Sequence, residues 1–150
     1  MNINEDFDEI IDYARMWDWA PEWLLAKEIY SRFPNSYSIL TPFAYSYLEQ
    51  FIRATTHEYG DWPFDKEGNP KRYAVGYNLV RLAIEENADK PDYVELLEQA
   101  KQYFNNGDIR LKGERRNNVS HGIVHPDKWT KENFEELIHY LATISKFSQF

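Results

Sequence analysis

The chain contains no cysteine, which excludes disulfide frameworks, thiolate nucleophiles and cysteine-based metal centres. It also lacks a long hydrophobic run. The longest uncharged stretch, residues 33–48, contains two prolines and is shorter than the ~20 apolar residues that a membrane helix needs. The first residues are acidic, and no apolar segment of a signal peptide follows them. We therefore expect a cytoplasmic protein that makes no membrane contact.

Glycine is also scarce, and the six glycines are scattered, so no glycine-rich phosphate loop can be recognised. The four histidines show no metal-ligand spacing, and neither a His-Glu-x-x-His nor a Gly-x-Ser-x-Gly pattern occurs. We expect neither a metal nor a cofactor. Apolar material is ample, with 43% hydrophobic and 17% aromatic residues. In a chain of 150 residues this composition suits one folded domain covering 1–150.

Apolar residues recur at spacings of three and four along most of the chain, and sustained alternation is absent. This periodicity predicts an all-α fold, namely an up-and-down bundle of five or six helices. Thr41 and Pro42 predict the N-cap and first residue of a long helix extending to about Gly60, and the last helix is expected to start at Thr130. Residues 61–72 concentrate Gly, Pro, Asp and Asn and predict an inserted loop.

Several aromatic residues near the N-terminus recur at helical spacing. Aromatic side chains in such positions favour the core or a subunit interface, and the alternative is that they stack on nucleic-acid bases. We expect the core or interface role for Tyr13, Trp17, Trp19 and Trp23.

The charge of the chain is unevenly distributed. Seventeen basic and 25 acidic residues give a net charge of −8, which on average repels nucleic acid. Residues 106–131, however, contain six basic and three acidic side chains, a local charge of +3, and are poor in aliphatic residues. This segment is either a solvated face or a phosphate-binding surface. For the second role the candidate contacts are Arg110, Lys112, Arg115 and His125.

A short motif lies inside the basic segment. Arg116 is followed by Asn117, and His121 is followed by Gly122, ahead of the expected last helix. This Arg-x4-His arrangement, late in an all-helical chain, resembles the R-x4-6-H motif of the HEPN superfamily. The resemblance implies a helical bundle, a metal-independent endoribonuclease activity and a homodimer with the active site at the dimer interface. It also implies a role in toxin–antitoxin or abortive-infection systems, with a cognate antitoxin as a candidate partner.

The motif residues suit the chemistry of RNA cleavage. Without a metal, the reaction needs a base for the 2′-hydroxyl, an acid for the departing 5′-oxygen and a cation near the phosphorane. His121 is the candidate acid–base group, Arg116 the fixed charge, and Asn117 orients the ring or holds a phosphate oxygen. Five residues along a helix place Arg116 roughly 140° from His121 around the axis, so Arg116 has to reach around.

One copy of the motif supplies one histidine, whereas the reaction needs both an acid and a base. The second group is either His125 of the same chain or His121 of a second copy, and the family resemblance implies the second copy. Ser120 and Glu49 are candidate supporting residues. Glu49 lies in residues 45–53, which are similar to an earlier bundle helix of the superfamily. We expect it either to pair with Arg116 or to be an exposed helix residue.

Three alternatives to catalysis remain open from the sequence. In the first, the chain is a non-catalytic HEPN module that binds RNA, a nucleotide or a protein partner. In the second, it is a scaffold whose acidic surface docks a basic partner. In the third alternative, Arg116 and His121 only complement the dipole at a solvated helix end.

Overall fold

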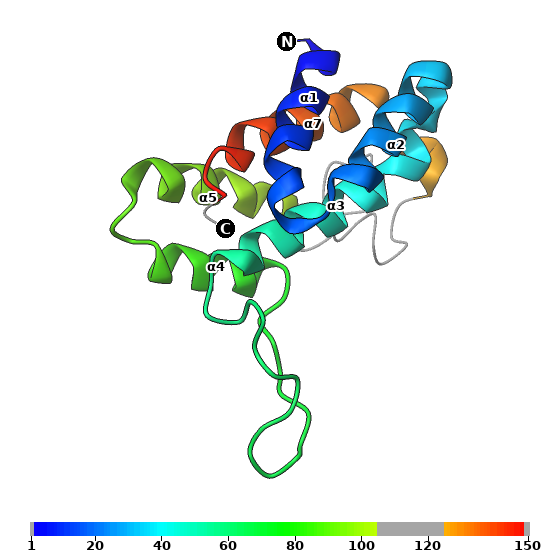
Figure 1. Cartoon of the computed structure of the whole chain (residues 1–150). Coiled ribbons are helices and arrows are strands. Elements are labelled where there is room, and N and C mark those ends of the chain that lie inside the picture. Colours follow the sequence, from blue (N-terminus) through cyan, green and yellow to red (C-terminus); the bar gives the residue numbers. More distant parts are fainter. Residues whose placement is uncertain (1, 105–124, 149–150) are drawn as a thin grey trace.

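The computed structural model describes residues 2–104 and 125–148, whose regular structure is helical. These two ranges contain six α-helices and no β-strand, although Phe64 and Pro70 form an isolated β-bridge. The expected all-helical bundle of five or six helices is therefore confirmed. None of the described helices combines the length and the apolar character needed to cross a membrane. The helices are α1 (Ile3–Ala14), α2 (Ala20–Arg32), α3 (Tyr37–Ala54), α4 (Tyr77–Glu86), α5 (Pro91–Phe104) and α7 (Lys131–Ser145) (Figure 1).

The other helices are arranged around α3 (Figure 1). This helix packs against α7 and α4, while α1 packs against α7 and α2, and α5 pairs with α4. Half of α3, nine of its 18 residues, is buried. It contains one carboxylate, Glu49, among these buried residues. A charge in this position has to be compensated from within the protein, because burying an unpaired carboxylate is strongly unfavourable.

An aromatic cluster joins α2 to α3. Trp23 is fully buried, and the centroid of its ring lies 4.8 Å from that of Phe43 and 5.0 Å from that of Tyr47. Trp17 and Trp19 are partly buried against the same core, and each lies 5.2 Å from Tyr47. The rings meet at tilted or edge-on angles, which are the favoured geometries of aromatic pairs. The expected core role of these three tryptophans is therefore confirmed.

The predicted start of the long helix is wrong. Instead of beginning with Thr41 as N-cap, α3 begins about one turn earlier, at Tyr37. Pro42 then lies inside the helix and has no N–H to donate to the carbonyl of Ser38. The Thr41 hydroxyl donates to the carbonyl of Tyr37 at 2.7 Å, and both Leu40 and Thr41 are buried. Burial of Leu40 and Thr41 and the Thr41 hydroxyl bond offset the missing backbone hydrogen bond.

The predicted end of the same helix, near Gly60, is also wrong, because α3 ends at Ala54. The two threonines that follow compete with the helical hydrogen bonds. The Thr55 hydroxyl donates to the carbonyl of Ile52, and the Thr56 hydroxyl donates to the carbonyl of Arg53, each at 2.8 Å. Such local side-chain bonds satisfy the last carbonyls and favour termination.

The predicted start of the last helix is confirmed. Thr130 is the extended N-cap of α7, and its hydroxyl oxygen accepts a hydrogen bond from the N–H of Asn133 at 3.1 Å. The preceding Trp129 is buried, which anchors the entry into the helix. The buried face of α7 includes the expected apolar residues Phe134, Leu137, Ile138, Leu141 and Ile144.

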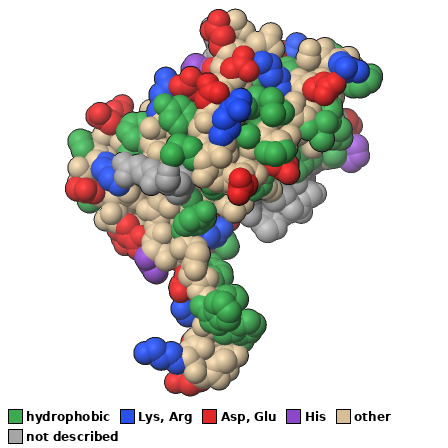
Figure 2. All heavy atoms as spheres, viewed as in Figure 1, with side chains coloured by type: hydrophobic (Ala, Val, Ile, Leu, Met, Phe, Trp, Pro, Cys, Tyr) green, Lys and Arg blue, Asp and Glu red, His purple; other side chains and the backbone are tan. Residues whose placement is uncertain are grey.

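The loop expected at residues 61–72 lies within a longer non-helical connection. No helix occurs between Ala54 and Tyr77. The chain projects here from the helical body as a narrow arm (Figure 1). Figure 2 shows hydrophobic side chains gathered on this arm, away from the core.

Replacing Trp23 by alanine should lower the free energy of unfolding by about 3–5 kcal/mol, because a fully buried indole is lost and a cavity remains. Trp62 is the matched control. It is 72% exposed, so Trp62→Ala should change the free energy of unfolding by less than about 0.5 kcal/mol. Urea denaturation followed by circular dichroism measures both values. Equal losses in the two variants would contradict a core centred on the contacts between α2 and α3.

Candidate functional site

Most residues predicted to act in catalysis or phosphate binding fall in residues 105–124, outside the described part of the chain. Their roles therefore stay predictions. They are Arg110, Lys112, Arg115, Arg116, Asn117, Ser120 and His121. Two further candidates, Glu49 and His125, are described by the structure.

His125 lies at the start of a short 3-10 helix, Pro126–Lys128, and its side chain is 78% exposed. Its Nδ1 lies 3.2 Å from the backbone nitrogen of Asp127 and 2.9 Å from the carboxylate of the same residue. A neutral ring accepts the first contact through Nδ1, whereas a ring protonated at Nδ1 donates to the second. His125 therefore caps the turn before α7. Its exposure is compatible with the predicted phosphate contact, which stays a prediction.

Glu49 is buried in α3, so the alternative of an exposed helix residue is wrong. Its Oε1 accepts a hydrogen bond from the N–H of Gly76 at 3.2 Å and lies 3.8 Å from Nη2 of Arg53. Gly76 adopts φ 56° and ψ −130°, a conformation that glycine reaches without the strain a side chain would add. The pairing of Glu49 with Arg116 stays a prediction, since Arg116 lies outside the described residues.

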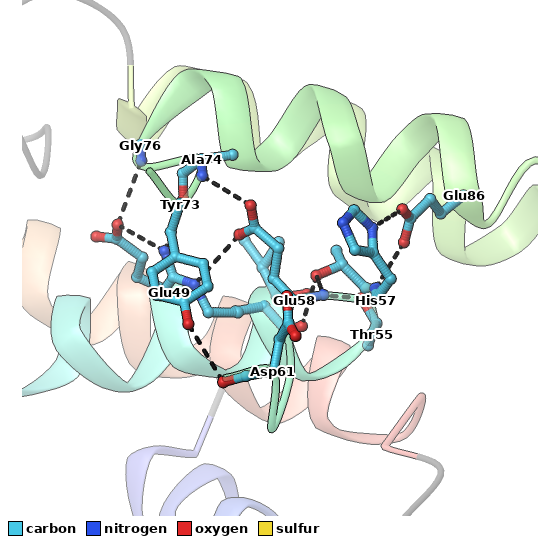
Figure 3. A network of polar contacts seen from close by, with 12 residues as sticks. Glu49, Thr55, His57, Glu58, Asp61, Tyr73, Ala74, Gly76 and Glu86 are labelled. Carbon is cyan, nitrogen blue, oxygen red and sulfur yellow. Dashed lines mark hydrogen bonds and ion pairs between the residues drawn. The ribbon is translucent and has the colours of Figure 1, made fainter. Parts of the chain in front are cut away.

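Arg53, one turn after Glu49, contacts two carboxylates and a backbone carbonyl in a polar network that we call the clamp. Figure 3 labels its members Glu49, Glu58, Ala74 and Gly76. Its Nη2 donates to the carbonyl of Ala74 at 2.7 Å, and its Nε lies 3.6 Å from Oε2 of Glu58. Through Oε1, Glu58 accepts from the N–H of Ala74 at 2.9 Å. The clamp thus consists of the Glu49, Arg53 and Glu58 side chains with the backbone of Ala74 and Gly76. It holds the end of the loop, just before α4, against α3.

A cleft of about 480 Å³ opens beside the clamp. The charged groups of its lining are two carboxylates and one guanidinium, so the lining carries a net negative charge. Such a lining disfavours phosphate, and a polynucleotide backbone is therefore expected to bind elsewhere. The lining residues are Ser46, Glu49, Gln50, Arg53, Glu58, Tyr59, Gly60 and Tyr73.

A second ionisable pair links the turn after α3 to α4. Nδ1 of His57 contacts one carboxylate oxygen of Glu86, and the His57 backbone N–H donates to the other at 2.8 Å (Figure 3). The hydrogen bond to Glu86, followed by its negative charge, raises the pKa of His57 above its ordinary value. Burial acts to raise the pKa of Glu86, but the hydrogen bonds from His57 outweigh it and lower that pKa. The contact therefore favours a protonated His57.

The third described histidine, His139, connects α7 to α1, because its Nδ1 lies 3.1 Å from Oδ1 of Asp6. His57, His125 and His139 thus lie on three different elements, and each contacts a carboxylate. None of the three lines the cleft beside the clamp. In the two described ranges, no group of three or more His, Asp or Glu side chains could hold a metal ion. For the whole chain, the absence of a metal stays a prediction.

The sequence does not predict the clamp. Its one local signal is the spacing of Glu49 and Arg53, which places opposite charges on the same face of α3. The remaining partners cannot be recognised in this way, because Ala74 and Gly76 contribute backbone groups from a loop more than 20 residues away.

No family model, curated protein or solved structure matches this chain. The resemblance to the HEPN superfamily therefore stays a prediction, resting on the motif from Arg116 to His121.

Arg53→Ala should lower the free energy of unfolding by about 2 kcal/mol, because it removes the cation that contacts the buried Glu49 and the partly buried Glu58 carboxylates. Arg32 offers a matched control. It pairs with Glu28 at the same helical spacing, but both side chains are more than half exposed, so Arg32→Ala should cost less than about 0.5 kcal/mol. Chemical denaturation measures both. A loss in Arg53→Ala no larger than in Arg32→Ala would contradict a stabilising clamp.

The His57–Glu86 contact predicts a pH-dependent contribution to stability. Because the folded pKa of His57 is raised, this contribution is present below the unfolded value of about 6.5 and is lost as pH rises through the folded pKa. In an NMR titration, Glu86→Gln should lower the pKa of the His57 ring toward its ordinary value. Glu85→Gln, which neutralises the adjacent exposed carboxylate, is the control and should leave it raised. An unchanged pKa in Glu86→Gln would contradict the pairing.

Proposed function

We propose that the protein is a metal-independent endoribonuclease of the HEPN type that acts as a homodimer, in a toxin–antitoxin or phage-defence setting. The observation that carries the proposal is the Arg116–His121 motif inside the one strongly basic segment of an otherwise acidic chain. The segment joins α5 to the entry of α7 in an all-helical protein. This order of elements agrees with the fold that the family resemblance implies.

The distribution of charge supports RNA contact at residues 106–131. The cleft beside the clamp has a net negative lining and disfavours a phosphate backbone. Residues 106–131 carry +3, whereas the remainder of the chain carries −11. RNA phosphates therefore have one favourable segment, in which Arg110, Lys112 and Arg115 precede the motif.

The three described histidines lie outside the motif. His57 and His139 are engaged by Glu86 and Asp6, and they lie away from the basic segment in sequence. His125 lies close to the motif but caps the turn before α7. The acid–base role falls to His121 because it is the motif histidine, and, as the family resemblance implies, the second histidine of the reaction comes from a second copy of the chain.

In the proposed reaction, one His121 removes the proton of the 2′-hydroxyl, and the 2′-oxygen attacks the adjacent phosphorus. His121 of the second copy protonates the departing 5′-oxygen, so the P–O5′ bond breaks and a 2′,3′-cyclic phosphate and a 5′-hydroxyl are formed. Arg116 stabilises the negative charge on the phosphorane. Asn117 orients the His121 ring or holds a phosphate oxygen, and Ser120 supports the motif.

His121→Ala should reduce RNA cleavage in EDTA by at least about 100-fold, because a proton-transfer group contributes on that order. The expected wild-type products carry a 2′,3′-cyclic phosphate, which denaturing gels and mass spectrometry identify. His57→Ala is the matched control and should retain cleavage, since His57 lies on another element.

His125→Ala distinguishes the two sources of the second histidine. The homodimer predicts a small effect on the cleavage rate, whereas pairing within one chain predicts a loss as large as that of His121→Ala. Unchanged cleavage in His121→Ala would overturn the proposed catalytic role. RNA binding with steep salt dependence but without product from the wild type would instead indicate the non-catalytic module.

A further inference from the structure

The projecting arm, residues 60–75, is an ordered element. Its two sides are joined by the hydrogen bond from the N–H of Lys71 to the carbonyl of Pro63 at 3.0 Å and by the bridge between Phe64 and Pro70. Near the tip, the N–H of Asp65 donates to the carbonyl of Asn69 at 2.9 Å. At its base the clamp fixes Ala74 and Gly76 to α3. The arm therefore presents its side chains from a defined position.

The arm exposes aromatic side chains that the core does not use. Trp62 is 72% exposed and Phe64 is 45% exposed. The other four tryptophans are buried or lie partly buried against the core. Figure 2 shows the hydrophobic side chains of the arm facing solvent, clear of the helical body. Exposed aromatic faces of this kind can stack on unpaired bases.

The acidic side chains at the arm's ends are engaged internally. Both oxygens of Asp61 bind Nζ of Lys71 at 3.1 Å. The Asp65 carboxylate accepts from the N–H groups of Glu67 and Asn69, each at 2.9 Å. The hydrogen bond from Lys71 lowers the pKa of Asp61, and the backbone hydrogen bond from Asn69 does the same for Asp65. Both carboxylates are thus satisfied without an external cation.

The arm's remaining cations are available to an anionic partner. Lys66 and Arg72 are exposed, and neither forms an ion pair within the part of the chain that the structure describes. Glu67 is the one arm carboxylate left without a side-chain partner among those residues. Overall, the arm carries three basic and three acidic residues and is neutral, in contrast to the net charge of −8 for the chain. Phosphate repulsion is therefore weaker here than over most of the surface.

We infer that the arm is a binding element for single-stranded RNA, in which bases stack on Trp62 and Phe64 while Lys66 and Arg72 contact phosphates. The inference rests on the proposed ribonuclease function and adds a second contact outside the motif. Stacking surfaces and cations on the same arm are the combination that binds single strands with little sequence preference. A base-paired duplex hides its base faces and gains little from such an arm.

The test measures binding of a fluorescently labelled oligoadenylate in EDTA, on protein that carries His121→Ala so that the RNA stays intact. Trp62→Ala should weaken this binding about tenfold, because one stacked base is lost. Trp62→Phe should stay within about twofold, since an aromatic face remains. Binding to the duplex of the same strand with oligouridylate should change by less than about twofold.

Two controls separate stacking from other effects. Phe33→Ala removes an aromatic side chain that is 66% exposed at the end of α2, and it should leave RNA affinity unchanged. Lys66→Ala and Arg72→Ala should each reduce the slope of log affinity against log salt by about one. Circular dichroism of each variant should match the parent, because all four side chains are exposed.

The outcomes distinguish the arm from the active site. Unchanged oligoadenylate affinity in Trp62→Ala would overturn the inference, and so would loss of self-association in its place, which would assign the arm to a protein interface. The proposed catalytic role is judged separately, by cleavage in protein that retains His121. Wild type that binds RNA through Trp62 without cleaving it would support the arm and overturn the nuclease.

Discussion

Burial of the Glu49 carboxylate in α3 is the constraint on which the clamp, and with it the position of the loop after α3, depends. An isolated carboxylate in such a position is strongly unfavourable, so the chain brings a cation and a backbone donor to it. Arg53 comes from the same helix, and Gly76 comes from the far side of the loop. Because Arg53 also binds Ala74, charge compensation in the helix positions the loop. A local electrostatic requirement thereby produces a long-range contact.

The same carboxylate also influences where on the surface a polyanion is repelled. The cleft beside the clamp is lined by Glu49, Arg53 and Glu58 and therefore has a net negative lining. This charge disfavours binding of a polyanion. Basic residues are concentrated instead between α5 and α7. An acidic body repels a polyanion over most of its surface, and the basic segment and the neutral arm are the exceptions. The net charge of −8 is therefore compatible with the proposed ribonuclease function.

Features determined by neighbouring residues could be predicted from the sequence, whereas features determined by tertiary contacts could not. Thr130 caps α7 as expected, since an N-cap acts on a donor three residues away. The start of α3 was predicted wrongly at Pro42, because burial of Leu40 and Thr41 outweighs one missing hydrogen bond. The partners of Arg53 were not predictable, since Ala74 contributes only its backbone. For the motif from Arg116 to His121, the residue types suggest the chemistry, while its geometry lies outside the described residues.

Packing in the core accounts for the presence of Trp23 but not for that of Trp62. Trp23 is fully buried, and its ring packs against Phe43 and Tyr47 of α3 and against Phe7 of α1, so core packing accounts for its presence. Core packing does not account for Trp62, because this side chain is exposed on an arm that projects into solvent. The clamp and the internal bonds of Asp61 and Asp65 order that arm before any ligand binds. Ordering of this kind reduces the conformational entropy lost on binding, so an exposed indole held in place contributes more affinity than one on a flexible loop.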